Sequence, residues 1–521
     1  MVGPARHIVF PEWTEYQKKN GLDPLGMRTS SVSIYQTLLP GISNVTLRAR
    51  YYGLYAWLCH HYAESVRDTN PKSWQRFVRR AEALFALICY RHGGETGVAG
   101  VAWAGRTIEG LGDPGELIDF ATAAEPGSDI YYLRQAWGAY GAAYASQLYE
   151  VGIYGVSEGH ELPVPTQELG VPLALAFTEV LGALADQFLA ILGRGAVTLT
   201  ELDALAAMAP SKIPTGSDER ECYERILFAE ADLERPADLE RRKTLLILLA
   251  LCGQTNSASK IHDIRWMLYT NNDEQGNALG FATDELIDHS RKWWIYQAND
   301  LVHIAYETIL KYTLDLLEPY AGGVTLSQLI AEAVGNLRSA AENWPDTWEE
   351  VVSASPTSDV NAERPLTEEV MQDARWDRVC SPEGVWKAIR LLAIVHNRSR
   401  QLINHIESEL NGLNPALFHS LRSEYRFLES QAAVDLEKFF TKLIEQRIIR
   451  RHLWVALRKL RYQGDYTFLV ESDDGKVRLR SKDGPAFTNP RLGPAMTFLK
   501  DIHLIDNEGL TEQGRMVLSR A

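Results

Sequence analysis

Apolar side chains recur every three to four residues over most of the first 460 positions. This spacing is typical of helices that bury one face. The clearest runs predict helices at 45–65, 72–92, 130–150, 289–317, 383–410 and 417–462. In the run 289–317, Trp293, Tyr296 and Leu301 fall on one apolar stripe. The pattern therefore predicts a mainly α fold, a multi-helical body without a central parallel sheet.

One stretch interrupts the helical pattern. Residues 343–366 are rich in Pro, Ser and Asp, which favour turns and loops over helix interiors. We therefore divide the expected body into a first part at 1–342, a loop or linker at 343–366 and a helical extension at 367–446.

The last 75 residues change in character. Two short β-type runs flank Asp474-Gly475, which is a strong hairpin signal. A helical stretch from 491, a turn at 507–509 and a last helix follow. This order resembles the end of many winged-helix domains. The resemblance implies a small C-terminal α+β domain at 447–521.

Charge makes the tail distinctive. The chain has 521 residues and a net charge of −15, so its surface as a whole does not favour nucleic acid. Residues 447–482, in contrast, carry ten basic and four acidic side chains. We interpret this excess as a phosphate-binding surface. The other interpretations are a solvated face, or docking against the acidic body of the chain or against another protein. The expected nucleic-acid-binding residues are Arg458, Lys459, Arg461, Lys476, Arg478, Arg480 and Lys482.

A second distinctive pattern lies near the N-terminus. Pro40-Gly41-Ile42-Ser43 is followed by Arg48-Ala49-Arg50-Tyr51-Tyr52. This box resembles a segment in uncharacterised bacterial proteins that occur in defence-type gene clusters. The resemblance implies a bacterial origin, a role against phage or mobile DNA, and protein partners encoded nearby. We expect Arg48, Arg50 and Tyr52 to be structural or partner-binding, with a structural ion pair favoured for Arg48.

The run 383–410 contains two Arg/His spacings, Arg390 with His396 and Arg400 with His405. Such spacings resemble the HEPN ribonucleases, which are all-helical and need no metal. The resemblance implies that a His transfers protons while an Arg stabilises the charge on the phosphorane. Several such spacings arise by chance in a chain with 13 His, so polar residues on a helix face are the favoured interpretation.

Searches for other chemistry exclude several classes. The sequence has no Gly-x4-Gly-Lys-Ser/Thr loop and no His-Glu-x-x-His pair. It therefore predicts no cofactor and no metal. Five scattered cysteines fit a reducing, cytoplasmic location, and no apolar run is long enough to cross a membrane. We therefore expect a non-enzymatic scaffold or sensor subunit of a defence system that binds DNA or a partner, with the HEPN-like ribonuclease as the alternative.

Overall fold

The computed structural model describes residues 23–520 except 114, 157, 160, 230–234, 256–260, 356 and 414–418. Helices make up 64% of the chain and strands 5%, which confirms the mainly α prediction. The sheets in the described residues contain only two or three strands. The first 22 residues of the expected body lie outside the described residues.

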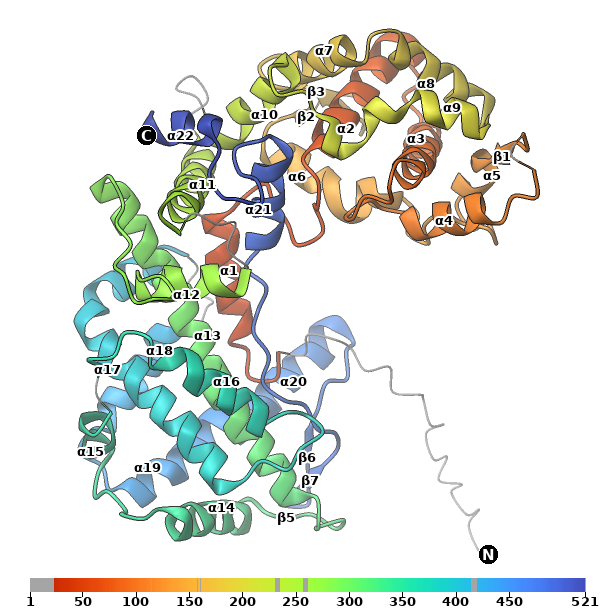
Figure 1. The fold of residues 1–521 in the computed structure, drawn as a ribbon. Coiled ribbons are helices and arrows are strands. Elements are labelled where there is room, and N and C mark those ends of the chain that lie inside the picture. Colours follow the sequence, from red (N-terminus) through yellow and green to blue (C-terminus); the bar gives the residue numbers. More distant parts are fainter. Residues whose placement is uncertain are drawn as a thin grey trace, which may run out of the picture.

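Figure 1 shows two helical lobes, one above the other, joined by a small set of helices. The upper lobe contains α2 (Arg50–His61), the π-helix η1 (Tyr62–Val66), α3 (Pro71–Arg91), α4 (Val101–Glu109), β1 (Ile118–Asp119), α5 (Phe120–Ala124), the π-helix η2 (Tyr140–Tyr144), α6 (Ala145–Glu150), β2 (Tyr154–Val156), β3 (Pro163–Pro165), α7 (Gly170–Leu181), α8 (Ala183–Arg194), β4 (Ala196–Val197), α9 (Leu199–Ala204), the 3₁₀ turns η3 (Ala206–Met208) and η4 (Pro210–Lys212), and α10 (Asp218–Phe228). Strands β1 and β4 form one antiparallel pair, and β2 and β3 form another.

The lower lobe is built around one long helix. It contains α13 (Asp284–Leu317), β5 (Val324–Thr325), α14 (Leu326–Ala340), α15 (Trp348–Ser353), α16 (Glu363–Asp373), α17 (Pro382–Leu413), α18 (Leu421–Ser430), α19 (Leu436–Lys442), the π-helix η5 (Leu443–Ile449), α20 (Arg450–Gln463), β6 (Val470–Asp473) and β7 (Lys476–Leu479). The elements between the lobes are α1 (Arg28–Leu38), α11 (Pro236–Thr255), α12 (Ile261–Thr270), α21 (Leu492–Asp501) and α22 (Glu512–Ser519).

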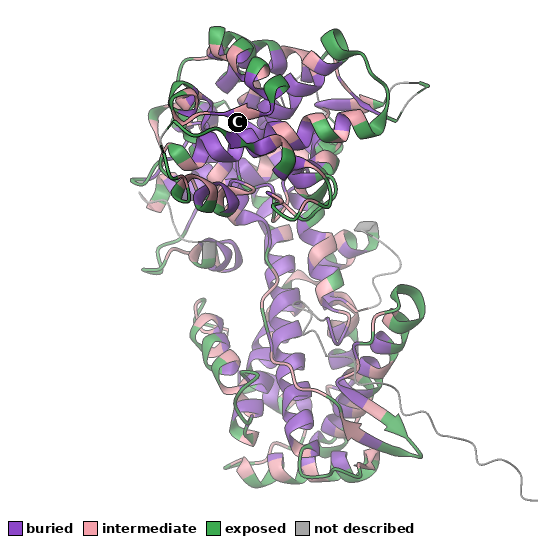
Figure 2. Ribbon diagram, turned by 90° about the vertical axis from the view of Figure 1, so that its right-hand side faces the viewer, coloured by how far each residue is buried: buried purple, intermediate pink, exposed green. Residues whose placement is uncertain are grey.

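Helices α2 and α13 form the centres of the two lobes. Most residues of each are buried, because neighbouring helices cover them. Helix α13 is the long purple helix that runs down the lower lobe in Figure 2. Helix α13 begins where the Thr283 side chain accepts the Leu286 N–H, which caps its first turn. It then packs along α17 and α1. Its buried Trp293, Trp294 and Tyr296 are therefore core residues.

The expected helix at 130–150 is only partly helical. Helical structure begins at Tyr140, whereas the preceding residues wrap around the buried carboxylate of Glu82. That carboxylate accepts hydrogen bonds from the Tyr55 and Tyr132 hydroxyls and from the backbone N–H groups of Ala139 and Tyr140. Since a buried carboxylate needs such donors, tertiary contacts override local helix propensity here.

The segment 343–366, expected as a linker, contains α15 and the first residues of α16. The helices before and after this segment pack against each other: α13 and α14, which precede it, both contact α17, which follows it. The expected long helix at 417–462 is also divided. It consists of α18 and a continuous run of α19, η5 and α20, which begins where Asp435 caps α19 by accepting the Lys438 N–H.

The winged-helix interpretation of 447–521 is not confirmed. The hairpin does form, with Ser472 opposite Val477, and Leu492–Asp501 is helical. However, β7 also pairs with β5 from the body, and the sheet order is β5-β7-β6. Helices α21 and α22 lie beside α11, far above the hairpin in Figure 1. The hairpin and the last two helices are therefore parts of different regions of the molecule.

In the described part of the chain, no single helix has both the length and the apolar content to cross a membrane. Helices α7 and α8 are together long and apolar enough by length and composition alone, but the chain bends by 98° between them.

Candidate nucleic-acid interface

The exposed face of α20 combines aromatic and basic side chains. This helix continues α19 and η5 without a break and ends at Gly464, whose φ of 71° closes its last turn. Trp454, Arg458, Arg461 and Tyr462 project from one arc of about 100° when placed at 100° per residue. Trp454 is 45% exposed and Tyr462 is 73% exposed, so the aromatic surface is open to a ligand.

Three arginines lie over three exposed aromatic rings on this surface and beside it. The Cζ atom of Arg458 is 5.5 Å from the ring centre of Trp454, and that of Arg461 is 5.6 Å from Tyr462. On the hairpin side, Arg480 is 5.9 Å from Tyr466. Cation–π contacts at such distances hold a guanidinium beside a ring without neutralising its charge.

The seven cations expected from the sequence fall into three groups. Within the described residues, Arg458, Arg461 and Lys476 form no ion pair. Arg478 is partly exposed and Arg480 is exposed. They lie 3.7 and 3.8 Å from the hairpin carboxylates of Asp473 and Glu471, respectively. Such long, solvated pairs contribute little and leave both guanidinium groups accessible.

The other two cations are held by the protein. Lys459 donates to the Asp23 backbone carbonyl at 2.9 Å, and burial lowers the pKa of its ammonium group. Lys482 pairs with Asp315 at 2.7 Å and Glu318 at 2.6 Å. Burial opposes its charge, but these two carboxylates outweigh it and raise the pKa of Lys482. The surface therefore presents five accessible cations out of the seven expected.

Buried contacts fix α20 in place below this surface. His452 donates from Nδ1 to the Pro24 carbonyl at 3.1 Å, and its Nε2 accepts the Leu469 N–H at 2.8 Å. Burial lowers the pKa of His452 to about 4, so the ring is neutral at pH 7. On the same helix, Arg451 pairs with the buried Glu424 of α18 at 2.6 Å.

The four residues expected for a ribonuclease do not form the two expected pairs. Residues five or six apart on a helix point in different directions, and the observed contacts follow this rule. His396 and Arg400, one turn apart, both contact Glu429 at 3.1 Å, and Arg400 also pairs with Glu349. These glutamates raise the pKa of Arg400, whereas burial and then Arg400 lower that of His396 to about 4. His405 is half-buried and its Nε2 has no hydrogen-bond partner among the described residues.

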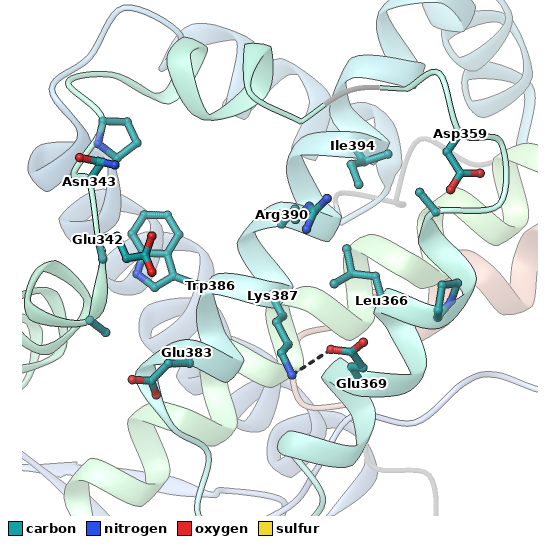
Figure 3. Close-up of a pocket in the computed structure, with 15 residues that line it drawn as sticks. Glu342, Asn343, Asp359, Leu366, Glu369, Glu383, Trp386, Lys387, Arg390 and Ile394 are labelled. Carbon is teal, nitrogen blue, oxygen red and sulfur yellow. Dashed lines mark ion pairs between the residues drawn. The ribbon is translucent and has the colours of Figure 1, made fainter.

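Arg390 lies apart from that group, in a cavity of about 750 Å³ between α16, α17 and the segment after α14 (Figure 3). Lys387 in the same cavity points toward Glu369 and pairs with it at 2.9 Å. The remaining ionisable residues in the wall are Glu342, Asp359 and Glu383. Four carboxylates and two cations make this cavity unfavourable for phosphate.

Arg48, Arg50 and Tyr52 are buried at the junction of the upper lobe with its neighbours. Arg48 pairs with Asp501 of α21 at 2.9 Å, and Arg50 pairs with Glu219 of α10 at 2.9 Å. The Tyr52 hydroxyl donates to the Gly41 carbonyl, which closes the Pro-Gly turn onto α2. All three therefore have structural contacts, and the ion pair favoured for Arg48 is present.

Sequence reasoning did not single out Trp454, Tyr462 or Tyr466. The signal was present for two of them, because Trp454 and Tyr462 are eight positions apart, with Arg458 and Arg461 between them, and therefore lie near one helix face. No group of three or more potential metal ligands occurs in the described part of the chain.

Comparison with protein-family models, curated proteins and solved structures found no match.

Proposed function

We propose that this protein binds nucleic acid through the exposed face of α20, together with the adjoining hairpin. In this proposal it is a non-enzymatic scaffold or sensor subunit of a bacterial system that acts against phage or mobile DNA. The observation that carries the binding role is the set of accessible arginines on exposed aromatic rings. The defence role rests on the resemblance of the Pro-Gly and Arg-Ala-Arg-Tyr box to proteins of defence-type gene clusters.

The chemistry of the surface supports phosphate and base contacts together. Arg458, Arg461 and Lys476 supply positive charge that no carboxylate of the described residues neutralises. The net charge of the chain is −15, but salt screens charges beyond about 8 Å at physiological ionic strength. A ligand on α20 therefore responds to the local cations more than to the distant acidic surface.

A protein partner is the second part of the scaffold role. Leu457 and Leu460 of α20 are 57% and 38% exposed, next to the arginines. Arg and Trp are enriched in protein interfaces, and exposed Leu adds apolar area. A subunit encoded by a neighbouring gene could bind this side of α20 while nucleic acid contacts the aromatic side.

The ribonuclease alternative has less support. A catalytic Arg must be free to contact the scissile phosphate, whereas Arg400 is held by two glutamates. The proposal therefore places binding on α20 and assigns no catalytic role to α17.

Fluorescence anisotropy with labelled oligonucleotides tests the proposal. We expect full-length protein to bind at low salt, and Arg458→Ala with Arg461→Ala to weaken binding. Each lost phosphate contact lowers the slope of log K against log salt by about 0.7–0.9, so the double variant should lose about 1.5 units of slope. When the oligonucleotide is RNA, it should be recovered intact, since the proposal expects no cleavage.

The control is the pair Arg76→Ala and Arg426→Ala, which removes the same charge from exposed sites on other helices. It should leave affinity and slope nearly unchanged. An equal loss in both double variants would show that binding is non-specific attraction to positive charge. No binding by the wild-type chain at low salt would end the proposal.

A further inference from the structure

A preformed cavity lies at the inner edge of the α20 surface. It has a volume of about 430 Å³, within the range of about 300–1,000 Å³ that is usual for small-ligand sites. Its wall comes from α20, from the segment that leads into α1 and the first turn of that helix, and from His419, two residues before α18. The lining residues are Asp23, Gly26, Thr29, Ser30, His419, Trp454, Val455, Arg458, Lys459, Tyr462 and Gln463. The exposed aromatic residues Trp454 and Tyr462 and the accessible Arg458 thus border this cavity.

The wall opposite α20 is held rigidly. The Asp23 carboxylate accepts the N–H groups of Arg28 and Thr29 at 3.2 and 3.0 Å, while Lys459 holds its backbone carbonyl. Gly26 has a φ of 74°, and a Cβ atom there would lie 3.0 Å from the His419 ring and 3.1 Å from Val455. Glycine thus permits the loop to approach both walls, so the cavity does not depend on a ligand to form.

The groups in the wall suit a flat heteroaromatic ring. The rings of Trp454 and His419 are 5.4 Å apart and perpendicular. Both ring nitrogens of His419 are buried, and neither has a hydrogen-bond partner among the described residues. Burial lowers the pKa of His419 to about 4, so the neutral ring carries one donor and one acceptor at pH 7. Arg458 also lines the cavity, where it can contact the phosphate of a nucleotide whose base occupies the cavity.

We infer that α20 binds single-stranded nucleic acid, with one unstacked base in the cavity beside Trp454 and its phosphate on Arg458. This inference rests on the proposed function and specifies its substrate class. In a duplex, both faces of a base are covered by its neighbours, so a base reaches an aromatic side chain only when it is unpaired. Tyr462, about 12 Å further along the helix axis, offers a second ring to the same strand.

The experiment compares one labelled 20-nucleotide single strand of mixed sequence with the duplex of the same sequence, using full-length protein at low salt. We expect the single strand to bind about tenfold more tightly than the duplex and to quench tryptophan fluorescence. Base–aromatic stacking is strong enough that Trp454→Ala should weaken single-strand binding by about tenfold or more. Trp454→Phe should retain most of the affinity.

Two further variants separate stacking from folding. Tyr462→Ala alters a side chain that is 73% exposed, so it should reduce single-strand affinity severalfold without affecting the fold. Trp376→Ala removes a tryptophan that is 58% exposed elsewhere and should change nothing.

The outcomes distinguish the inference from the proposed function. Equal or tighter binding of the duplex, sensitive to the Arg458 and Arg461 double variant, would overturn the single-strand inference and leave nucleic-acid binding intact. Unchanged single-strand affinity in Trp454→Ala and Tyr462→Ala would also overturn it. Failure of the wild-type protein to bind either oligonucleotide would remove both.

Discussion

Single buried ion pairs join segments that are far apart in the sequence. The Asp501 carboxylate of α21 accepts two hydrogen bonds at 3.0 Å, one from the Nε–H of Arg48 and one from the backbone N–H of Ala49. Burial raises the pKa of Asp501, and Arg48 opposes that increase. The sequence could indicate that Arg48 is structural, but nothing local identifies a partner more than 450 positions away.

Arg48→Ala should therefore destabilise the protein strongly. Removing one member of a buried pair leaves the other charge without compensation, which costs about 3–5 kcal/mol. Urea unfolding measures the loss in the free energy of unfolding. Arg76→Ala is the matched control, because Arg76 is 61% exposed and its loss should cost less than about 0.5 kcal/mol. If the two variants were equally stable, the ion pair between Arg48 and Asp501 would not stabilise the contact between α21 and the segment before α2.

At the scale of elements, periodicity predicted the long helices well. The limits expected for 72–92, 289–317 and 383–410 lie within five residues of α3, α13 and α17. Prediction failed where a polar partner from elsewhere determines the backbone, as Glu82 does for residues 132–139. It also missed β5, because two residues of strand have no detectable period.

His452 joins α20 to Pro24 and to the start of β6, and its titration gives a prediction for the pH dependence of stability. Its pKa is about 4 in the folded protein, below the usual 6.5, because burial disfavours the charged ring. The unfolded chain therefore takes up a proton first as pH falls below 6.5. The stability that neutral His452 contributes is complete above pH 6.5 and is lost as pH falls toward 4, by roughly 3 kcal/mol.

Unfolding in urea at several pH values measures this loss. His452→Gln should reduce the acid-dependent loss between pH 6.5 and 4 by up to about that amount, because glutamine does not titrate. Its neutral-pH stability should also fall, since the Leu469 and Val470 N–H groups lose the imidazole acceptor. His396 and His419 also have lowered pKa values and remain in the variant, so part of the acid sensitivity should persist. A variant with the full wild-type pH dependence would contradict this role for His452.

At the scale of the whole molecule, the chain after the hairpin runs from the lower lobe toward the upper one. Lys482 pairs with Asp315, Thr488 donates its backbone N–H to Asp300 at 3.0 Å, and Arg491 reaches the Ile42 carbonyl at 2.7 Å. These contacts hold residues 482–491 against α13 and the Pro-Gly turn. A resemblance to a winged helix could be read from local order alone, whereas the placement of its parts depends on these distant residues.

The fragment 447–521 should therefore fail to fold on its own. Separation removes β5 from β7, and it exposes Phe498, whose ring packs edge-on against Tyr52 at 5.3 Å in the full chain. Without those partners the hairpin and α21 lose most of their buried apolar area, and a unit of this size has little stability to spare. Far-UV circular dichroism should show no cooperative thermal transition for the fragment, while the full chain melts cooperatively. A cooperative transition in the fragment would restore an independent winged-helix-like domain, and the oligonucleotide experiments could then be repeated on the fragment alone.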